Sequence, residues 1–247
     1  IPADLYYADL DWSWDSDGDN RFGEMNDSVD FYSDVLVGRA SVENAAEARA
    51  FFAKVRSYEE DPDPGYVKRS LLPSGWLWRD IGYHGSFVND SIANFTPTGW
   101  QDVELINPPN AAVVAESVES GFAMFDPAGP GNEQGVYDAD GTPIYTSGYA
   151  RGQQNARRYN IMTSLACTPG NFEYEDCIAE LAHNCAGGGS IAVMMNSRYG
   201  WGTPPAFGPS EKLCARCFDF LFARGQTGLG ACHSRSREEY AGIALYD

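Results

Sequence analysis

The 247-residue chain has few positive charges and no long hydrophobic run. It carries 17 Lys and Arg against 35 Asp and Glu, which gives a formal net charge of −18. Because nucleic-acid binding relies on Lys and Arg to neutralise phosphates, this composition argues against a nucleic-acid partner. No window approaches the ~18 uninterrupted apolar residues of a membrane-spanning helix, so we expect no membrane span.

The chain also lacks an initiator Met and a signal peptide, since it opens with Ile1-Pro2-Ala3-Asp4. We therefore interpret it as a processed product or a fragment. Hydrophobic residues make up 43% of the chain, and its length is enough for one large domain or two small ones and for a sizeable core. Histidine is scarce, and the three candidates for an imidazole base are His84, His183 and His233.

Cysteine is absent from the first 166 residues. The six cysteines are Cys167, Cys177, Cys185, Cys214, Cys217 and Cys232. Cys214-Ala-Arg-Cys217 is a lone C-x-x-C without the second pair of a zinc finger, and it lies in an apolar helical pattern. We interpret these two cysteines as buried packing residues rather than zinc ligands. Export of the protein would allow disulfides, whose pairing the sequence does not define.

Apolar runs alternate with amphipathic stretches, which predicts an α/β domain with a mainly parallel sheet. The expected strands are 34–39, a part of 67–78, 122–125, 159–166 and 190–195, and the expected helices are 41–55 with Ser41 as N-cap, 111–120, 174–183 and 209–224. Residues 79–110 are rich in Gly, Asn, Ser and Pro and are predicted to form an irregular excursion. No linker or repeat divides the chain, so we expect a single domain over residues 1–247.

Three expected strand ends carry turn-forming, chemically suggestive residues: Gly129-Pro-Gly-Asn132, Ala166-Cys-Thr-Pro-Gly170 and Asn196-Ser-Arg-Tyr-Gly-Trp-Gly202. Catalytic groups of open parallel sheets collect at the carboxyl ends of the strands. Cys167 ends a strand and precedes a helix, whose N-terminus and exposed amides favour a thiolate and an oxyanion. The alternative is that Cys167 is a buried packing residue.

A series of motifs resembles the gingipain-like cysteine peptidases, in that family's order. The motifs are Tyr6-Tyr-Ala-Asp-Leu-Asp11, Trp14-Asp-Ser-Asp-Gly-Asp19, Phe22-Gly-Glu24, Asp34-Val-Leu-Val-Gly-Arg39, Leu165-Ala-Cys-Thr-Pro-Gly-Asn-Phe172, Ile178-Ala-Glu180, Gly187-Gly-Gly-Ser-Ile-Ala192 and Asn196-Ser-Arg-Tyr-Gly-Trp-Gly202. The resemblance covers most of the chain, with residues 79–120 poorly matched. It implies a caspase-like three-layer sandwich with helices flanking the sheet, and a Cys–His dyad that cleaves a peptide or protein substrate. It further implies a secreted or cell-surface protein, without the family's N-terminal part and with further domains in a longer precursor.

One position departs from the family pattern. The family's base is a histidine in a Gly-His-Gly turn on the strand before the cysteine strand, and the matching turn here is Gly129-Pro130-Gly131, 167 − 130 = 37 residues before Cys167. Proline cannot exchange a proton, so the thiol would lose its activation and the leaving amine its acid. Gly129 and Gly131 remain as turn positions that could face an oxyanion.

His84 is the alternative base. It lies in Tyr83-His-Gly-Ser86, 167 − 84 = 83 residues before Cys167, and no clear apolar strand leads into it. It could equally be a surface-loop histidine. Three hypotheses follow: an active cysteine endopeptidase with Cys167 and His84, a non-catalytic relative that serves as a binding or surface-assembly module, and an unrelated α/β protein with a structural calcium and a redox C-x-x-C.

The acidic segment 15–24 could bind calcium. Asp15, Asp17, Asp19 and Glu24 place carboxylates at nearly alternate positions, and Ca²⁺ prefers six to eight oxygen ligands. The match to an EF-hand loop is partial, because Asn20 occupies the position of the invariant Gly. Asp9 and Asp11 could add ligands. We predict a structural Ca²⁺, and the alternative is a solvated acidic turn.

Overall fold

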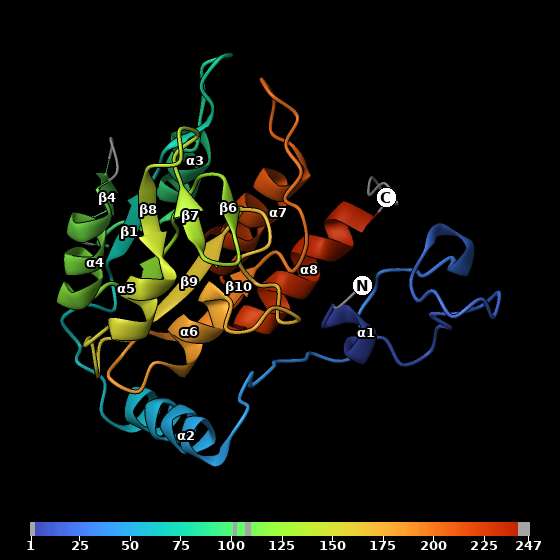
Figure 1. The fold of residues 1–247 in the computed structure, drawn as a ribbon, viewed down its shortest axis with the longest axis horizontal. Coiled ribbons are helices and arrows are strands. Elements are labelled where there is room, and N and C mark those ends of the chain that lie inside the picture. Colours follow the sequence, from blue (N-terminus) through green and yellow to red (C-terminus); the bar gives the residue numbers. More distant parts are fainter. Residues whose placement is uncertain (1–2, 101–102, 107–109, 242–247) are drawn as a thin grey trace.

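The computed structural model describes residues 3–100, 103–106 and 110–241. Its core is a five-stranded parallel sheet in the order β10-β9-β5-β1-β4 (Figure 1). The strands are β1 (Ser70–Pro73), β4 (Val103–Ile106), β5 (Met124–Phe125), β9 (Asn160–Ser164) and β10 (Ser190–Met195). Among the described residues, none forms a helix long and apolar enough to cross a membrane.

Helices cover both faces of this sheet, which makes a three-layer sandwich. Neighbouring residues of one strand point to opposite faces, so Leu71 belongs to one buried cluster and Leu72 to the other. The first cluster includes residues of α4 (Ala111–Ser120), α5 (Ser147–Gly152) and α6 (Ile178–Asn184), and the second those of α3 (Ser86–Phe95) and α7 (Pro209–Phe218). The α7 helix continues as a π-helical turn over Asp219–Ala223, and α8 (Leu229–Ala241) packs against both.

Two small antiparallel sheets follow the carboxyl ends of the central strands. One pairs β2 (Trp76–Trp78) with β3 (Tyr83–His84), and the other has the order β6 (Gly131–Asn132), β7 (Gly135–Tyr137) and β8 (Pro143–Thr146). Both sheets lie beyond the point where β1 and β5 end. They therefore surround the edge at which catalytic groups of such a sheet collect.

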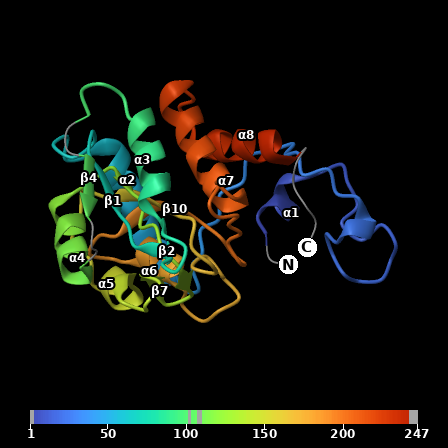
Figure 2. The ribbon, with the colours of Figure 1, turned by 90° about the horizontal axis from the view of Figure 1, so that it is seen from above.

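The N-terminal segment extends away from the sandwich, as two perpendicular views show (Figures 1 and 2). It contains the short α1 (Leu5–Ala8), a 3₁₀ turn at Met25–Asp27 and a long irregular stretch that leads to α2 (Ala45–Glu60). The strand predicted at 34–39 is wrong. Its three apolar side chains Val35, Leu36 and Val37 are exposed, because no neighbouring strand pairs with this segment in the described structure.

Two other boundaries differ from the sequence prediction. The N-cap of α2 is Asn44 rather than Ser41, because the Asn44 side chain accepts the amides of Ala46 and Glu47, at 2.9 and 3.1 Å. The Ser41 hydroxyl instead donates to Glu180, 2.6 Å away. The helix expected from residue 174 begins only at Ile178, where Glu180 caps the amide of Cys177.

The irregular excursion predicted for 79–110 is also wrong. This stretch contains β3, α3 and β4. The α3 helix buries Val88 and Ile92, one turn apart, and the side-chain amide of the buried Asn89 donates to the Pro73 carbonyl. The strands expected at 122–125, 159–166 and 190–195 are confirmed, as is the 111–120 helix, which Gly121 ends with a φ of +95°.

Candidate active site

The tips of β5 and β9 lie side by side. These strands pair in parallel, with Phe125 opposite Met162, so both point their carboxyl ends to the same edge. A Cβ placed on Gly131 would lie 2.7 Å from the Cβ of Ala166 and 3.6 Å from the carbonyl oxygen of Cys167. The turn after β5 therefore packs directly against the cysteine segment after β9.

Cys167 is partly exposed, and its sulfur contacts a third segment. The amide nitrogen of Gly200 lies 3.3 Å from Sγ, and the Gly200 carbonyl oxygen lies 3.6 Å from it. Asn196 holds the two segments together, because its side-chain amide donates to the carbonyls of Leu165 and Ala166, at 3.0 and 2.9 Å. The thiol thus lies at the junction of the β5, β9 and β10 ends.

The backbone next to Cys167 is strained. Thr168 has a φ of +55°, which is rare for a β-branched residue, and its amide is held by the Arg198 carbonyl at 2.9 Å. Backbone strain of this kind persists only where the surrounding contacts fix it, and it clusters at functional sites. It supports a functional interpretation of the cysteine segment.

Pro130 occupies the middle of the turn and has no group for proton transfer. Its carbonyl accepts the amide of Tyr137 at 2.8 Å, and Gly129 packs against the Tyr137 carbonyl and the Ile144 side chain. The turn is therefore fixed against the β7–β8 hairpin. Since proline has no N–H, only Gly129 and Gly131 can offer amides from these three positions.

His84 is a buried strand residue at the end of β3, with 6% of its surface exposed. Its ring packs edge-on against Trp76, with centroids 4.8 Å apart. Its neighbour Gly85 contacts the Ala128 carbonyl at the start of the turn, where a Cβ would lie 2.7 Å away. His84 therefore lies beside the first end of this turn, whereas the cysteine segment packs against its other end, at Gly131. Among the hydrogen bonds of the described residues, none joins His84 to Cys167.

The protonation of His84 follows from its contacts. Nδ1 accepts the Ser86 amide at 3.1 Å, so the neutral ring carries its proton on Nε2. Burial lowers the pKa of His84, and the nearby carboxylates of Asp138 and Asp90 oppose this shift. The ring is thus held neutral with its basic nitrogen occupied.

The other two histidines lie in helices. His183 stacks on Phe51 from α2, with centroids 4.7 Å apart. His233 lies in α8, where burial and then the charge of Arg237 lower its pKa to about 4. Neither has a hydrogen bond to the cysteine segment among those of the described residues.

Glu211 is a site residue that sequence reasoning missed. It lies in the first turn of α7, is 1% exposed, and neither carboxylate oxygen has a hydrogen-bond partner. A Cβ on Gly202 would lie 3.2 Å from Oε1 and would overlap the Trp78 ring. Burial is the main cause that raises the pKa of Glu211; the backbone amides of Glu211 itself and Gly208 lie near enough to oppose the shift but form no hydrogen bond with the carboxylate. Glu211 therefore sits behind the 200–202 segment, whose Gly200 contacts the thiol.

No local sequence signal distinguishes Glu211 from the other acidic residues. An acid in the first turn of a helix is commonplace, because it complements the helix dipole. Its burial against Gly202 and Trp78 is a tertiary effect.

All six cysteines are free thiols. The sulfur of Cys217 lies 4.0 Å from that of Met194, and burial raises its pKa to about 12. Burial, followed by the charge of Asp126, also holds the pKa of Cys214 well above its usual value. These two thiols therefore lack the low pKa of a redox C-x-x-C motif.

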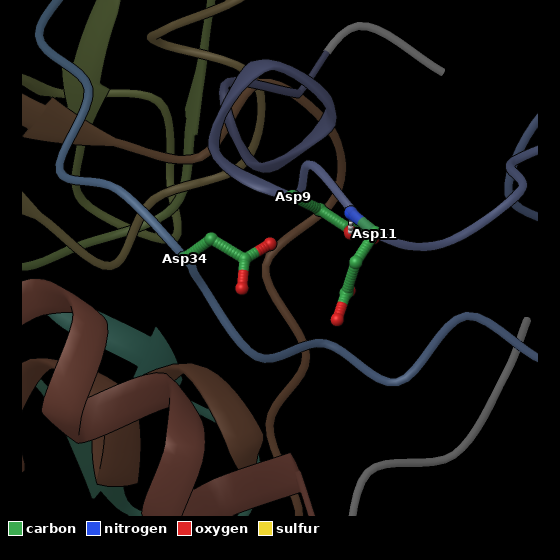
Figure 3. Close-up of side chains that lie close together, drawn as sticks. All are labelled: Asp9, Asp11 and Asp34. Carbon is green, nitrogen blue, oxygen red and sulfur yellow. Dashed lines mark hydrogen bonds between the residues drawn. The ribbon is translucent and has the colours of Figure 1, made fainter.

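Three groups of carboxylates gather in the N-terminal segment: Asp9, Asp11 and Asp34; Asp15, Asp17 and Asp27; and Asp17, Asp19 and Glu24. Within each group the oxygens lie within 4.8 Å of one another. No group among the described residues holds all four predicted ligands: Asp15 and Asp17 gather with Asp27, whereas Asp19 and Glu24 gather with Asp17. Figure 3 shows Asp9, Asp11 and Asp34 around one space.

The donor atoms of these groups fit a hard cation. They are carboxylate oxygens, the ligands that Ca²⁺ prefers. The nearby carboxylate of Asp34 is the main reason why the pKa of Asp11 is raised, followed by burial and by the charges of Asp30 and Asp9. The buried Asp27 accepts the amides of Ser16, Gly23 and Glu24 and so shapes the loop itself. A cation among the remaining oxygens would relieve their repulsion.

The parallel sheet and the cysteine at its carboxyl edge, next to the strained Thr168, are the arrangement expected of an α/β protein of the cysteine-peptidase type. The model of peptidase family C25 matches residues 1–245. The chain belongs to this family, and its sandwich is the caspase-like fold of the gingipains.

Solved structures show the same fold at low sequence identity. The crystal structure of the Arg-specific cysteine proteinase gingipain R has a TM-score of 0.69 and 16% identity, covering 85% of this chain and 51% of that chain. The complex of the pro- and mature domains of RgpB from Porphyromonas gingivalis gives 0.68 and 16%, over 85% and 53%. A structure described only as a protease gives 0.62 and 17%, over 94% and 56%. The chain thus spans about half of these structures, and it matches no curated protein.

Proposed function

We propose that this chain is the nucleophile-bearing part of a cysteine peptidase that hydrolyses peptide bonds through Cys167. The observation that carries the proposal is the partly exposed thiol just beyond the tip of β9, in a segment that packs against the turn after β5. Sγ attacks the scissile carbonyl carbon, the C–N bond breaks, and the amine leaves with a proton. Water then hydrolyses the thioester, which releases the acid and restores the thiol.

Backbone amides and His84 complete the proposed chemistry. The Gly200 amide, 3.3 Å from the sulfur, and the amides of Gly129 and Gly131 are the donors proposed for the oxyanion. His84 is the proposed base, since it lies beside the same turn. It can take the thiol proton only after the Ser86 amide releases Nδ1, so the proposal requires a local rearrangement on peptide binding.

Glu211 gives the proposed peptidase a substrate preference. A buried carboxylate without a partner is costly unless it stays protonated or receives a cation. The carboxylate lies behind the 200–202 segment and beside the Trp78 ring, an arrangement that suits a Lys or Arg side chain of a bound peptide. Gingipain R, which shares the fold, is described as Arg-specific.

The second candidate is a non-catalytic family member that binds peptides or assembles at a surface. Two observations favour it: Pro130 occupies the turn that contacts the cysteine segment, and the basic nitrogen of His84 is occupied. In either case we propose a secreted or cell-surface protein, possessing further domains, whose acidic segment binds Ca²⁺ through Asp15, Asp17, Asp19 and Glu24.

Cleavage of a broad peptide library by the purified chain tests the two candidates. The peptidase predicts products that disappear in both Cys167→Ala and His84→Gln. Cleavage that persists in Cys167→Ala would contradict the assignment of the nucleophile. If the chain itself is inactive but Pro130→His cleaves the library, the non-catalytic candidate is correct.

A further inference from the structure

A buried carboxyl group joins the two tips that carry the site. Asp126 directly follows β5 and is fully buried. Its Oδ1 accepts the hydroxyl of Thr163, the fourth residue of β9, and lies 3.7 Å from the Cys214 thiol of α7. Its Oδ2 has no hydrogen-bond partner. The peptidase chemistry proposed above uses none of these groups.

The position of this pair relates it to the site. The β5–β9 ladder ends at Phe125 and Met162, so Asp126 and Thr163 form the next rung through their side chains. The chain continues four residues from Asp126 to Pro130 (130 − 126 = 4) and four from Thr163 to Cys167 (167 − 163 = 4). One rung further, the Ser164 hydroxyl donates to the Pro127 carbonyl at 2.7 Å. Side-chain bonds therefore replace the sheet ladder where the turn and the cysteine segment begin.

We propose that Asp126 is a positioning residue, which clamps the tips of β5 and β9 in its protonated form and loosens them when it loses the proton. This inference rests on the proposed role of Cys167. Burial raises the pKa of Asp126 to about 7, although the hydrogen bonds from Thr163 and Cys214 oppose the shift. The change of state therefore falls near neutral pH.

The surroundings of Asp126 explain why ionisation loosens the clamp. Two helices present titratable groups to Asp126: the Cys214 thiol of α7, with Glu211 beyond it, and His233 of α8 across a cavity. The strands β1 and β9 present only uncharged hydrogen-bond partners, the Leu71 carbonyl and the Thr163 hydroxyl. No cation is among the partners of Asp126 in the described residues. A charged carboxylate in this dry site requires water.

A space for water opens beside both partners of Asp126. A cavity of about 60 Å³ is lined by residues that include Thr163, Met194, Cys214 and His233. This volume exceeds the ~15 Å³ that one water needs. Water that enters to solvate the ionised carboxylate would widen the space between the two tips, and the hydrogen bond from Thr163, which favours the charged form, only partly opposes this change.

Hydrogen exchange at about pH 6 and about pH 8, corrected for intrinsic rates, tests the clamp. The reporters are the amides of Asp126 and Ala128, bonded to Leu71 and Pro73, and the amide of Thr168. In the natural chain their protection should fall about threefold or more as the pH rises, while the β10 amides stay unchanged. In Asp126→Asn, which cannot ionise, the protection should not depend on pH.

Two substitutions of Thr163 separate positioning from general packing. Thr163→Val keeps the shape and removes the hydroxyl, so the tips should already be loose at the lower pH, whereas Thr163→Ser should behave like the natural chain. Identical pH profiles for the natural chain and Asp126→Asn would overturn the proposal, as would a loss of protection that spreads over β10. The exchange measurement does not depend on peptide hydrolysis, so an inactive chain that shows these profiles would refute the peptidase and leave the clamp standing.

Discussion

The contact between the turn and the cysteine segment predicts the effect of one added methyl group. In Gly131→Ala the new Cβ would lie 2.7 Å from the Cβ of Ala166 and 2.8 Å from the Gly135 carbonyl oxygen. Neither neighbour is the end of a flexible side chain. Since carbon atoms pack at about 3.5–4.0 Å, one of the two segments must move by about 0.8 Å or more.

The size of the effect follows from this displacement. Overpacking of this kind costs about 1–3 kcal/mol of unfolding free energy. Because Ala166 precedes Cys167, the thiol moves with it, and a displacement of about 1 Å at reacting groups can lower a rate about 100-fold. Any peptide cleavage should therefore fall by one to two orders of magnitude, more than the loss of stability explains.

Three assays on Gly131→Ala test this reasoning: urea unfolding, alkylation of Cys167 by iodoacetamide and, where the chain is active, peptide cleavage. Gly152→Ala is the matched control, because nothing lies within 4 Å of its Cβ. The control should change neither stability nor alkylation appreciably. If Gly131→Ala matches the control in all of them, the turn does not contact the cysteine segment as described.

Three further predictions concern charge. Glu211→Gln should lower the preference for peptides with Lys or Arg about tenfold or more without loss of stability. The control Glu116→Gln, at an exposed position, should leave this preference unchanged. An unchanged preference in Glu211→Gln would remove Glu211 from substrate recognition. Lys54 is buried with Nζ bonded to the carbonyls of His183 and Ser190, and burial lowers its pKa from 10.5 to about 8. Between these two pKa values only the unfolded chain holds the proton, so the stability of the natural chain should rise with pH by up to about 1.4 kcal/mol per unit relative to Lys54→Met. Chemical denaturation that gives the two chains the same dependence of stability on pH would contradict this. Ca²⁺ at 100 times its Kd should add about 2.7 kcal/mol of stability, and this gain should be smaller in Asp17→Asn. A melting temperature that changes with neither Ca²⁺ nor a chelator would exclude the site.

The sequence predicts the strands that carry the site, because each is a short apolar run followed within three residues by Pro or Asn. This pattern places Cys167 and the Gly129–Gly131 turn at the ends of neighbouring strands. The same reasoning fails at 34–39, where an equally apolar run lacks a partner strand. It also misses α3, whose buried Val88 and Ile92 lie among Gly, Asn and Ser residues that are typical of loops.

The remaining features of the site are tertiary. Nothing near Glu211 in the sequence indicates that Gly202 and Trp78 will bury it. The basic nitrogen of His84 is occupied by an amide two residues away, which the Tyr83-His-Gly-Ser86 motif does not reveal. Asp126 is bonded to a strand and a helix that follow it by 37 and 88 residues. Such long-range contacts decide protonation, and local patterns do not contain them.

If Cys167 is a nucleophile presented to a peptide at the carboxyl edge of the sheet, it should react with an electrophilic peptide. This reaction can be followed by mass spectrometry of the chain after treatment with a peptidyl acyloxymethyl ketone. We expect one adduct per chain, located on Cys167 and absent in Cys167→Ala. No adduct, or adducts distributed over the other five cysteines, would contradict it.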